Sequence, residues 1–272
     1  MDMISRLPTS FLRARLELLE ERLESMPIIR VGKHRNVPII REYYIENGVK
    51  KHREHLLSSV ASHELLKKAK YREGLLLAKK QIINCLVTAG GSSESISSQE
   101  SGKFGLDFWN ALMPCSLEAP TDSSYLHCGY RMRSRGEVMI AQVLDSLGLE
   151  YKYEPEVIVG GETYYPDFAV WFPEFGRCIF IEFLGMLDRQ NYAYKNGIKI
   201  ANYLNAGMVI NRDILIFCGT KNSMPTADEI AEDIIALITK FCRMYSSCNQ
   251  MGRESTPSCT LLSSKPVQGI VL

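Results

Sequence analysis

Apolar residues recur at helical spacing near the start of the chain. Within residues 10–25, leucines return every three or four positions among Arg and Glu, which predicts an amphipathic helix. Between residues 27 and 52 the pattern changes to short β-like runs, and Asn47-Gly48 between two of them favours a tight hairpin. A second helical pattern then runs from about residue 55 to 87. These patterns predict a module of helix, hairpin and long helix.

The second half of the chain alternates between helix and strand patterns. The expected helices cover residues 136–147, 189–205 and 226–245, and the expected strands are YKYEPEVIV, TYYPDFAVWF, RCIFIEFLG and DILIFC. Their order along the chain is αβββαβα. This order predicts a mixed α/β domain, with a sheet flanked by helices.

Composition shifts place the expected boundaries. Residues 90–102 contain nine Gly or Ser in thirteen positions, which is typical of a flexible connector. We therefore expect a basic module at 1–89, a linker and loop at 90–130, and an α/β domain at 131–245. Residues 246–272 show little periodicity and are expected to form a disordered tail.

Composition is that of a globular protein. The 272 residues are 46% hydrophobic and 23% charged, and no apolar run approaches the roughly 18 residues that span a bilayer. The start, MDMISRLPTS, lacks the apolar stretch of a signal peptide, so we expect a cytoplasmic protein with no membrane partner. Residues 1–89 carry 17 Lys/Arg against 10 Asp/Glu, and the remainder 15 against 21. This asymmetry indicates either a polyanion-binding arm beside an acidic site or a solvated helical face.

The positions of the cysteines and histidines limit the kinds of catalytic and metal site that the sequence predicts. The eight cysteines include no CxxC pair and no His stands at zinc-ligand spacing, so we expect reduced thiols. All five histidines lie at or before His127, which removes Ser-His-Asp and Cys-His catalysis from the second half of the chain.

Three carboxylates stand where a charge is expensive. Glu137 lies on the apolar stripe of its expected helix, Glu182 lies inside the apolar run CIFIEFLG, and Asp167 follows Pro166 in another hydrophobic strand. Convergent carboxylates without histidine are suited to a hard cation such as Mg²⁺ or Mn²⁺. Such an ion makes phosphodiester hydrolysis the natural candidate reaction. The structural alternative is that each carboxylate caps a helix or pairs with an arginine.

This ordered set of motifs resembles a known family. Glu137, then Tyr165-Pro166-Asp167, then Ile181-Glu182 on an αβββαβ frame is similar to the PD-(D/E)xK nuclease superfamily, which has a restriction-endonuclease-like core. Over about residues 10–225 the chain also resembles a largely uncharacterised group of bacterial and phage-associated proteins. Members of that group typically read S-K-S-E, Y-P-D-F, W-E-x-x-G-M-M-D and Y-A-x-K.

The resemblance implies roles at matching positions. Glu137 matches the helix carboxylate that orients water or a second ion, and Asp167 and Glu182 match the two metal ligands. The superfamily lysine should stand two residues after Glu182, where this chain has Leu184. Lys195 in Y-A-Y-K is the best replacement. Lys199 lies one turn later on the same helix face.

Basic residues near these positions are candidates for nucleic-acid contact. Arg131, Arg133 and Arg135 precede the helix that bears Glu137 and could position a phosphate backbone. Lys199, and in the N-terminal module Lys50, Lys51 and Arg53, complete the set, with ordinary surface residues as the alternative.

Two interpretations follow. The first is a metal-dependent nuclease that hydrolyses phosphodiester bonds, with DNA favoured over RNA and Mg²⁺ or Mn²⁺ as cofactor. The alternative is a nuclease-like fold without activity that binds nucleic acid or a protein partner, which the missing strand lysine favours. The sequence leaves open whether the chain acts alone or as a homodimer.

Overall fold

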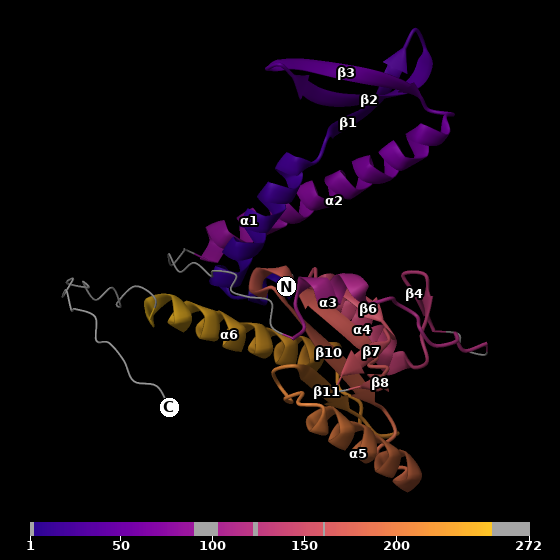
Figure 1. Cartoon of the computed structure of the whole chain (residues 1–272), viewed down its shortest axis with the longest axis vertical. Helices are drawn as coiled ribbons and strands as arrows, with labels where there is room; N and C mark the ends of the chain where they lie inside the picture. Colours follow the sequence, from indigo (N-terminus) through magenta and orange to yellow (C-terminus); the bar gives the residue numbers. More distant parts are fainter. Residues whose placement is uncertain (1–2, 90–102, 122–124, 160, 252–272) are drawn as a thin grey trace, which may run out of the picture.

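The computed structural model describes residues 3–89, 103–121, 125–159 and 161–251. Over these residues the protein is mixed α/β, with six α-helices and several sheets. A three-stranded sheet stands at one end of two long helices, and a four-stranded sheet flanked by helices stands at their other end (Figure 1). The predicted linker at 90–102 lies outside the described residues.

The N-terminal part consists of α1 (Thr9–Ser25), β1 (Ile28–His34), β2 (Val37–Glu46), β3 (Val49–Leu56) and α2 (Val60–Ala89). The strands form an antiparallel sheet in the order β1-β2-β3. The predicted turn at Asn47-Gly48 is confirmed, and both residues have the positive φ that a two-residue hairpin requires. The long helix starts later than predicted, because His55 and Leu56 still pair in β3. No helix within the described ranges, α2 included, is long and apolar enough to cross a membrane.

The second part is built around a four-stranded sheet in the order β11-β10-β9-β6. Strands β10 and β11 are parallel, whereas β6, β9 and β10 are antiparallel neighbours. The elements in chain order are α4 (Arg135–Ser146), β6 (Glu150–Tyr153), β9 (Phe168–Phe172), β10 (Arg177–Leu184), α5 (Gln190–Asn205), β11 (Ile214–Cys218) and α6 (Ala227–Met251). The predicted alternation of helix and strand is therefore confirmed as a mixed α/β arrangement.

Two predicted strands are each interrupted. The run YKYEPEVIV splits into β6 and β7 (Val157–Val159), and TYYPDFAVWF splits into β8 (Glu162–Tyr164) and β9. Each break contains a proline, Pro155 or Pro166, which has no N–H to donate to a neighbouring strand. Strands β7 and β8 instead pair with each other as a separate hairpin.

The segment before α4 lies mostly in the predicted linker and loop at 90–130. It contains the short helix α3 (Leu106–Ala111) and the short hairpin of β4 (Leu126–His127) and β5 (Tyr130–Arg131). Helix α6 continues to Met251, beyond its predicted end at Tyr245. The predicted tail from 252 to 272 lies outside the described residues.

Helices cover both faces of the four-stranded sheet. Apolar residues of α1, α4 and α6 form one buried cluster against the face that includes Phe168 and Ile181. Residues of α3 and α5 form another against the face that includes Phe180. Two short 3-10 helices, Met3–Arg6 and Pro173–Phe175, complete the described elements.

Helix α1 belongs to the core of the second part. The ring of its Phe11 stacks on Phe175 with centroids 5.6 Å apart, and its Arg15 Nε donates to the buried Glu174 carboxylate over 2.5 Å. The buried core is thus continuous between the two predicted domains.

Glycine at 136 is required by close packing at the start of α4. A Cβ atom there would lie 2.1 Å from Cε1 of the buried Phe183 ring. Overpacking of this kind costs about 1–3 kcal/mol, so we expect Gly136→Ala to lower the free energy of unfolding by about that amount. Urea denaturation would measure it.

The matched control is Gly197→Ala within α5, where an added Cβ meets no atom within 4 Å. That substitution should stabilise the protein by about 0.5–1 kcal/mol, because alanine favours a helix. Equal effects of the two substitutions would contradict the packing at Gly136.

Candidate active site

The strand register brings two of the predicted carboxylates together. Phe168 and Ile181 are the last pair of β9 with β10, and Asp167 and Glu182 are the next residue along each of the two segments. Phe168 and Ile181 both belong to the cluster under α4 and α6. Because side chains alternate along a strand, Glu182 and the neighbouring Asp167 are expected on the other face, toward α5. The Glu182 charge acts on the Asp167 carboxylate, so the two lie near each other.

Asp167 lies at the break between β8 and β9. Its carbonyl accepts a hydrogen bond from the Glu154 N–H over 2.9 Å, and its carboxylate Oδ2 accepts one from the Phe183 N–H over 2.6 Å. The second bond ties the side chain to the backbone of β10. Proline at 166 therefore ends the regular pairing at the position where the Asp167 side chain turns toward the backbone of β10.

Glu182 is held by two residues of α5. The Lys199 ammonium lies 2.7 Å from Oε1 and 2.8 Å from Oε2, and the Tyr203 hydroxyl donates to Oε1. Lys199 also donates to the carbonyl of Tyr165 over 3.1 Å. Lys199 and Tyr203 are four residues apart, so both occupy one face of the helix. The Glu182 side chain is 2% exposed, and these contacts supply the charge and hydrogen bonds that its burial requires.

Glu137 caps the helix on which it stands. Ser134 is the N-cap residue: its hydroxyl accepts from the Glu137 N–H over 3.2 Å and donates to Oε1 over 2.7 Å. The other oxygen, Oε2, accepts from the Arg133 N–H and from the Tyr153 hydroxyl over 2.9 and 2.7 Å. This capping box explains the buried carboxylate by itself, as the structural alternative anticipated.

The carboxylates influence one another electrostatically. Burial raises the pKa of Asp167 well above its usual range, and the charges of Glu182 and Glu137 raise it further. Burial also raises the pKa of Glu182, although the Lys199 charge opposes that shift. Burial and the Glu182 carboxylate likewise raise the pKa of the Tyr203 hydroxyl, which keeps it a donor. The burial of these carboxyl groups around one lysine therefore favours their protonated forms.

Not all three carboxylates meet at one point. Among the described residues, the only group of three His, Cys, Asp or Glu whose ligand atoms all lie within 4.8 Å of one another is His127, Cys128 and Asp145. Oxygen ligands at about 2.1 Å from a Mg²⁺ ion can be at most about 4.2 Å apart. One ion therefore could not take Glu137, Asp167 and Glu182 together without movement. Asp167 and Glu182 carry only oxygen donors, the type of ligand that a hard cation prefers.

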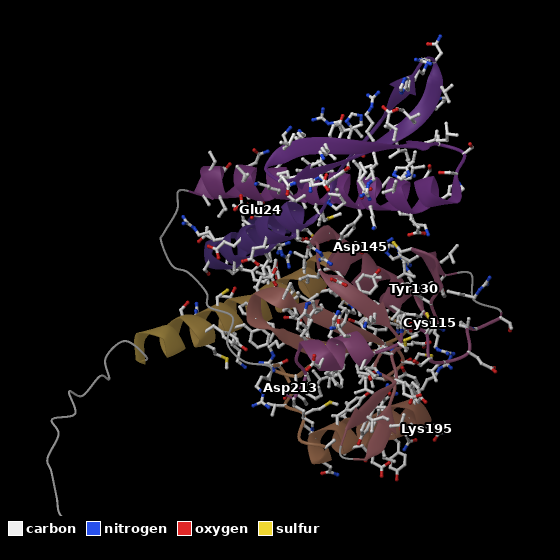
Figure 2. All side chains as sticks on the ribbon, turned by 45° about the horizontal axis from the view of Figure 1, so that its top comes forward. Glu24, Cys115, Tyr130, Asp145, Lys195 and Asp213 are labelled. Atoms are coloured by element: carbon white, nitrogen blue, oxygen red, sulfur yellow. The ribbon has the colours of Figure 1, made fainter. Side chains whose placement is uncertain are left out.

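The structure places Lys199, not Lys195, at the carboxylates. Lys195 is exposed on α5 and makes no ion pair with any of the described residues (Figure 2). Leu184 is buried and brings no amine to the strand. Both lysines line a cavity of about 830 Å³, together with polar groups of Tyr165, Asn202 and Asn205. The cavity thus adjoins the Glu182 contact and has a cationic wall.

The other predicted nucleic-acid contacts are dispersed. Arg131 and Arg135 are exposed before and at the start of α4. Arg133 is also exposed, and its guanidinium pairs with the buried Glu154 carboxylate and donates to the Glu118 carbonyl over 2.8 Å. The hydrogen bond to Glu154 raises the pKa of Arg133, so this guanidinium already has a partner within the protein.

The three candidates on β3 do not share one face of their sheet. Lys50 pairs opposite Ile45, and Lys51 and Arg53 pair opposite Tyr44 and Glu42 on the other face. Lys50 lies over the Tyr43 ring at 5.2 Å, Arg53 over the Tyr44 ring at 4.9 Å, and Lys51 pairs with Glu46 at 2.6 Å. This sheet stands at the far end of α2 from α5, so it does not border the carboxylates (Figure 1).

Sequence reasoning named Lys199 as a candidate beside Lys195, but it missed Ser134, Tyr203 and Tyr153 as residues that support the carboxylates. Ser134 had a detectable signal, since S-x-x-E before an apolar run is the pattern of a capping box. Tyr203 had a weaker signal, since it stands four residues after Lys199 on a helix that follows a buried glutamate. Tyr153 had no signal, because its partner lies sixteen residues away on another element.

The raised pKa values predict how stability depends on pH. Between their ordinary values and the raised ones, Asp167 and Glu182 hold more protons in the folded than in the unfolded chain. The free energy of unfolding should therefore fall as pH rises above the ordinary pKa of a carboxyl group, about 4, and through the raised pKa values. We expect a smaller fall in Asp167→Asn, measured by urea denaturation in EDTA. Asp233→Asn on α6 is the control, and equal slopes in all three proteins would contradict the proposed burial.

The arrangement combines features suited to reactions of charged phosphate groups. Paired carboxylates can hold a divalent cation, an amine can neutralise a phosphate oxygen, and the adjoining cavity has room for a polymer segment. Searches of protein-family models, curated proteins and solved structures gave no match to this chain. Its function is therefore inferred from its own residues.

Proposed function

We propose that the protein is a metal-dependent nuclease with a restriction-endonuclease-like core of the PD-(D/E)xK type. The observation that carries this proposal is that Asp167, next to the end of β9, lies close enough to Glu182 of β10 to feel its charge, with the Lys199 amine on Glu182. The chain order αβββαβ around a mixed sheet supports it, because this is the frame that the sequence resemblance implies.

Asp167 and Glu182 would hold Mg²⁺ or Mn²⁺. Such an ion neutralises phosphate charge and makes a bound water more acidic. The bond from the Phe183 N–H fixes the Asp167 carboxylate, and Tyr203 fixes that of Glu182. Both ligands are therefore oriented before any substrate arrives.

Lys199 takes the role of the lysine that is missing from β10. Its ammonium lies at Glu182 and also lines the cavity, so it can contact a phosphate oxygen there. A cation positioned where negative charge develops stabilises the transition state. Glu137 is held rigidly by Ser134, Arg133 and Tyr153, and it positions water near the metal ligands.

The polymer is bound in the cavity beside α5. Lys195 and Lys199 provide positive charge there, and Asn202 and Asn205 provide amide groups for phosphate or sugar oxygens. These contacts fix a backbone without reading sequence. DNA is the favoured polymer.

Cleavage of DNA and RNA by the purified chain tests the proposal. Single- and double-stranded substrates are incubated with Mg²⁺, Mn²⁺ or EDTA, and products are resolved on denaturing gels. We expect metal-dependent cutting that falls at least about 100-fold in Asp167→Asn and Glu182→Gln, because a bound metal is worth several kcal/mol in the transition state. Asp233→Asn on α6 is the matched control and should cut normally. Cutting that survives EDTA or both site variants would refute the proposed metal site.

The two lysines of α5 give a second prediction. Lys199→Met should lower the cleavage rate by about 10²–10³-fold, as loss of one preorganised charge at a reaction centre does. Lys195→Met should weaken substrate binding with a much smaller effect on the maximal rate, because Lys195 lines only the cavity. Single-turnover rates at saturating DNA separate the two effects. The reverse ranking would restore Lys195 to the role that the sequence indicated.

One observation favours a second function, nucleic-acid binding without cleavage. Lys199 engages both oxygens of Glu182 and Tyr203 engages one of them, so a cation must compete for this ligand. Under this alternative the folded protein binds DNA but does not cut it with either metal. Its affinity should still fall steeply with salt, since phosphate contacts release counterions.

A further inference from the structure

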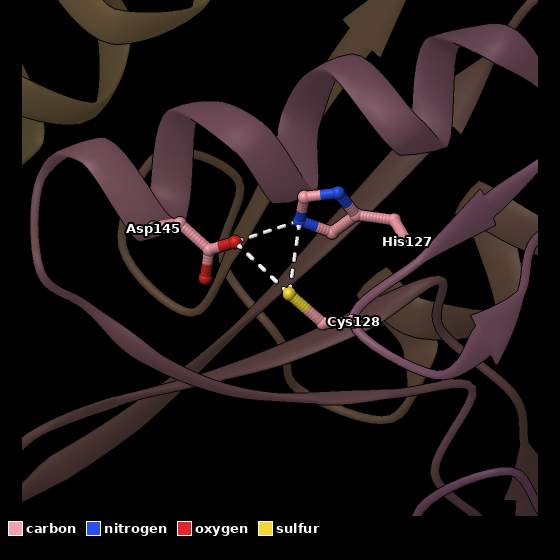
Figure 3. A group of neighbouring side chains, drawn as sticks. All are labelled: His127, Cys128 and Asp145. Atoms are coloured by element: carbon pink, nitrogen blue, oxygen red, sulfur yellow. Dashed lines mark hydrogen bonds and ion pairs between the residues drawn. The ribbon is translucent and has the colours of Figure 1, made fainter.

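A histidine, a cysteine and an aspartate converge on the side of the second part, away from the carboxylates. His127 and Cys128 come from the β4–β5 hairpin, and Asp145 comes from the last turn of α4 (Figure 3). Cys128 and Gly129 form the two-residue turn, and both have positive φ. This turn directs the Cys128 sulfur back toward α4, so three side chains meet that no linear motif joins.

The contacts exclude a Cys-His-Asp catalytic triad. The His127 Nε2 atom lies 2.6 Å from Asp145 Oδ2 and 3.5 Å from Cys128 Sγ. A triad uses both ring nitrogens, one to donate to the carboxylate and the other to accept the thiol proton. Here one nitrogen serves both neighbours. All three heteroatoms therefore surround a common point.

The distances match those of a tetrahedral metal site. Zinc–sulfur bonds of about 2.3 Å and zinc–nitrogen or zinc–oxygen bonds of about 2.0 Å place sulfur about 3.5 Å from the other two ligand atoms. The Cys128 sulfur is 3.5 Å from His127 Nε2 and 3.6 Å from Asp145 Oδ2. A tetrahedral zinc site would separate its nitrogen and oxygen ligands by about 3.3 Å. His127 Nε2 and Asp145 Oδ2 are closer, 2.6 Å apart, because a hydrogen bond joins them.

We propose that His127, Cys128 and Asp145 bind a zinc ion, which joins the β4–β5 hairpin to α4 and keeps a fourth coordination position open. The donor set decides the metal: a thiolate and an imidazole suit Zn²⁺, whereas Mg²⁺ requires oxygen ligands. On binding, the Cys128 thiol gives up its proton to solvent and the sulfur takes the metal in its place. The His127 side chain is 17% exposed and that of Asp145 is 43% exposed, so an ion reaches them from solvent.

The zinc site does not depend on the nuclease proposal. Asp145 and Glu137 are eight residues apart on α4, about 12 Å along the helix axis. The two sites also differ in donor chemistry, with nitrogen and sulfur in one and oxygen alone in the other. A nuclease that lacks zinc and a zinc-binding protein that lacks cleavage are distinguishable outcomes.

Cobalt(II) substitution tests the site. The full chain is prepared free of metal in a non-thiol reductant and titrated with Co²⁺, and visible and near-ultraviolet spectra are recorded. We expect intense tetrahedral d–d bands and a thiolate-to-cobalt charge-transfer band, both removed by one equivalent of Zn²⁺. A wild-type protein that shows neither band while it remains folded by circular dichroism would overturn the proposal.

Variants assign the signal to this cluster. Cys128→Ser should remove the charge-transfer band. Cys128→Ser or Asp145→Asn should lower the affinity for zinc at least about 100-fold, since mutating residues that only support metal ligands already lowers affinity about 10–100-fold. Cys218→Ser removes another exposed cysteine, at the end of β11, and should leave the spectrum intact. Asp167→Asn should also leave the spectrum unchanged, because the Asp167 carboxylate belongs to the other site. A band lost in Cys218→Ser or Asp167→Asn but kept in Cys128→Ser would place the metal elsewhere.

Discussion

A carboxylate buried in the central strand, Glu182, constrains how the surrounding elements pack. Removing its charge from water is costly, so the fold must supply a cation and hydrogen-bond donors at that point. Lys199 and Tyr203 meet this requirement from one face of α5, which fixes the rotation of that helix against the sheet. On the opposite face of the same strand, the Phe183 ring sets how closely α4 can approach. Two neighbouring residues of β10 thus position a helix on each side.

Glu137 shows how one side chain can both cap a helix and act electrostatically on its neighbours. It closes the first turn of α4 through Ser134, and its charge raises the pKa of both strand carboxylates. A capping role does not exclude a role in chemistry. Three donors hold its two oxygens in place, and a carboxylate without rotamer freedom presents its remaining lone pairs in a constant direction.

Much of the frame could be predicted from local patterns, because hydrophobic periodicity and turn residues are encoded within a few positions of each other. The hairpin at Asn47-Gly48 and the apolar strand around Glu182 are examples. The two strands that contain Pro155 and Pro166 were expected to be continuous, because apolar residues stand on both sides of each proline.

The contacts of the candidate site depended on tertiary packing instead. Lys195 and Lys199 have similar local surroundings in sequence, and only the rotation of α5 decides which amine reaches Glu182. The pairing of Arg133 with Glu154 was not predicted, because nothing nearby in the sequence indicated that Glu154 would be buried beside it. The meeting of His127 and Cys128 with Asp145 likewise required both the hairpin and α4 to be placed.

The long helix α2 sets the distance between the β1–β3 sheet and the core of the second part. Ile82 of this helix lies in that core, and the Ser62 hydroxyl donates to the Leu56 carbonyl at the sheet. The two residues are twenty positions apart, which is about 30 Å along the helix axis. Contacts of Arg72 and Lys79 with α1 brace the helix along this length. The two ends of this span are therefore held at a set separation. The β1–β3 sheet cannot approach the core of the second part unless the contacts between α1 and α2 break.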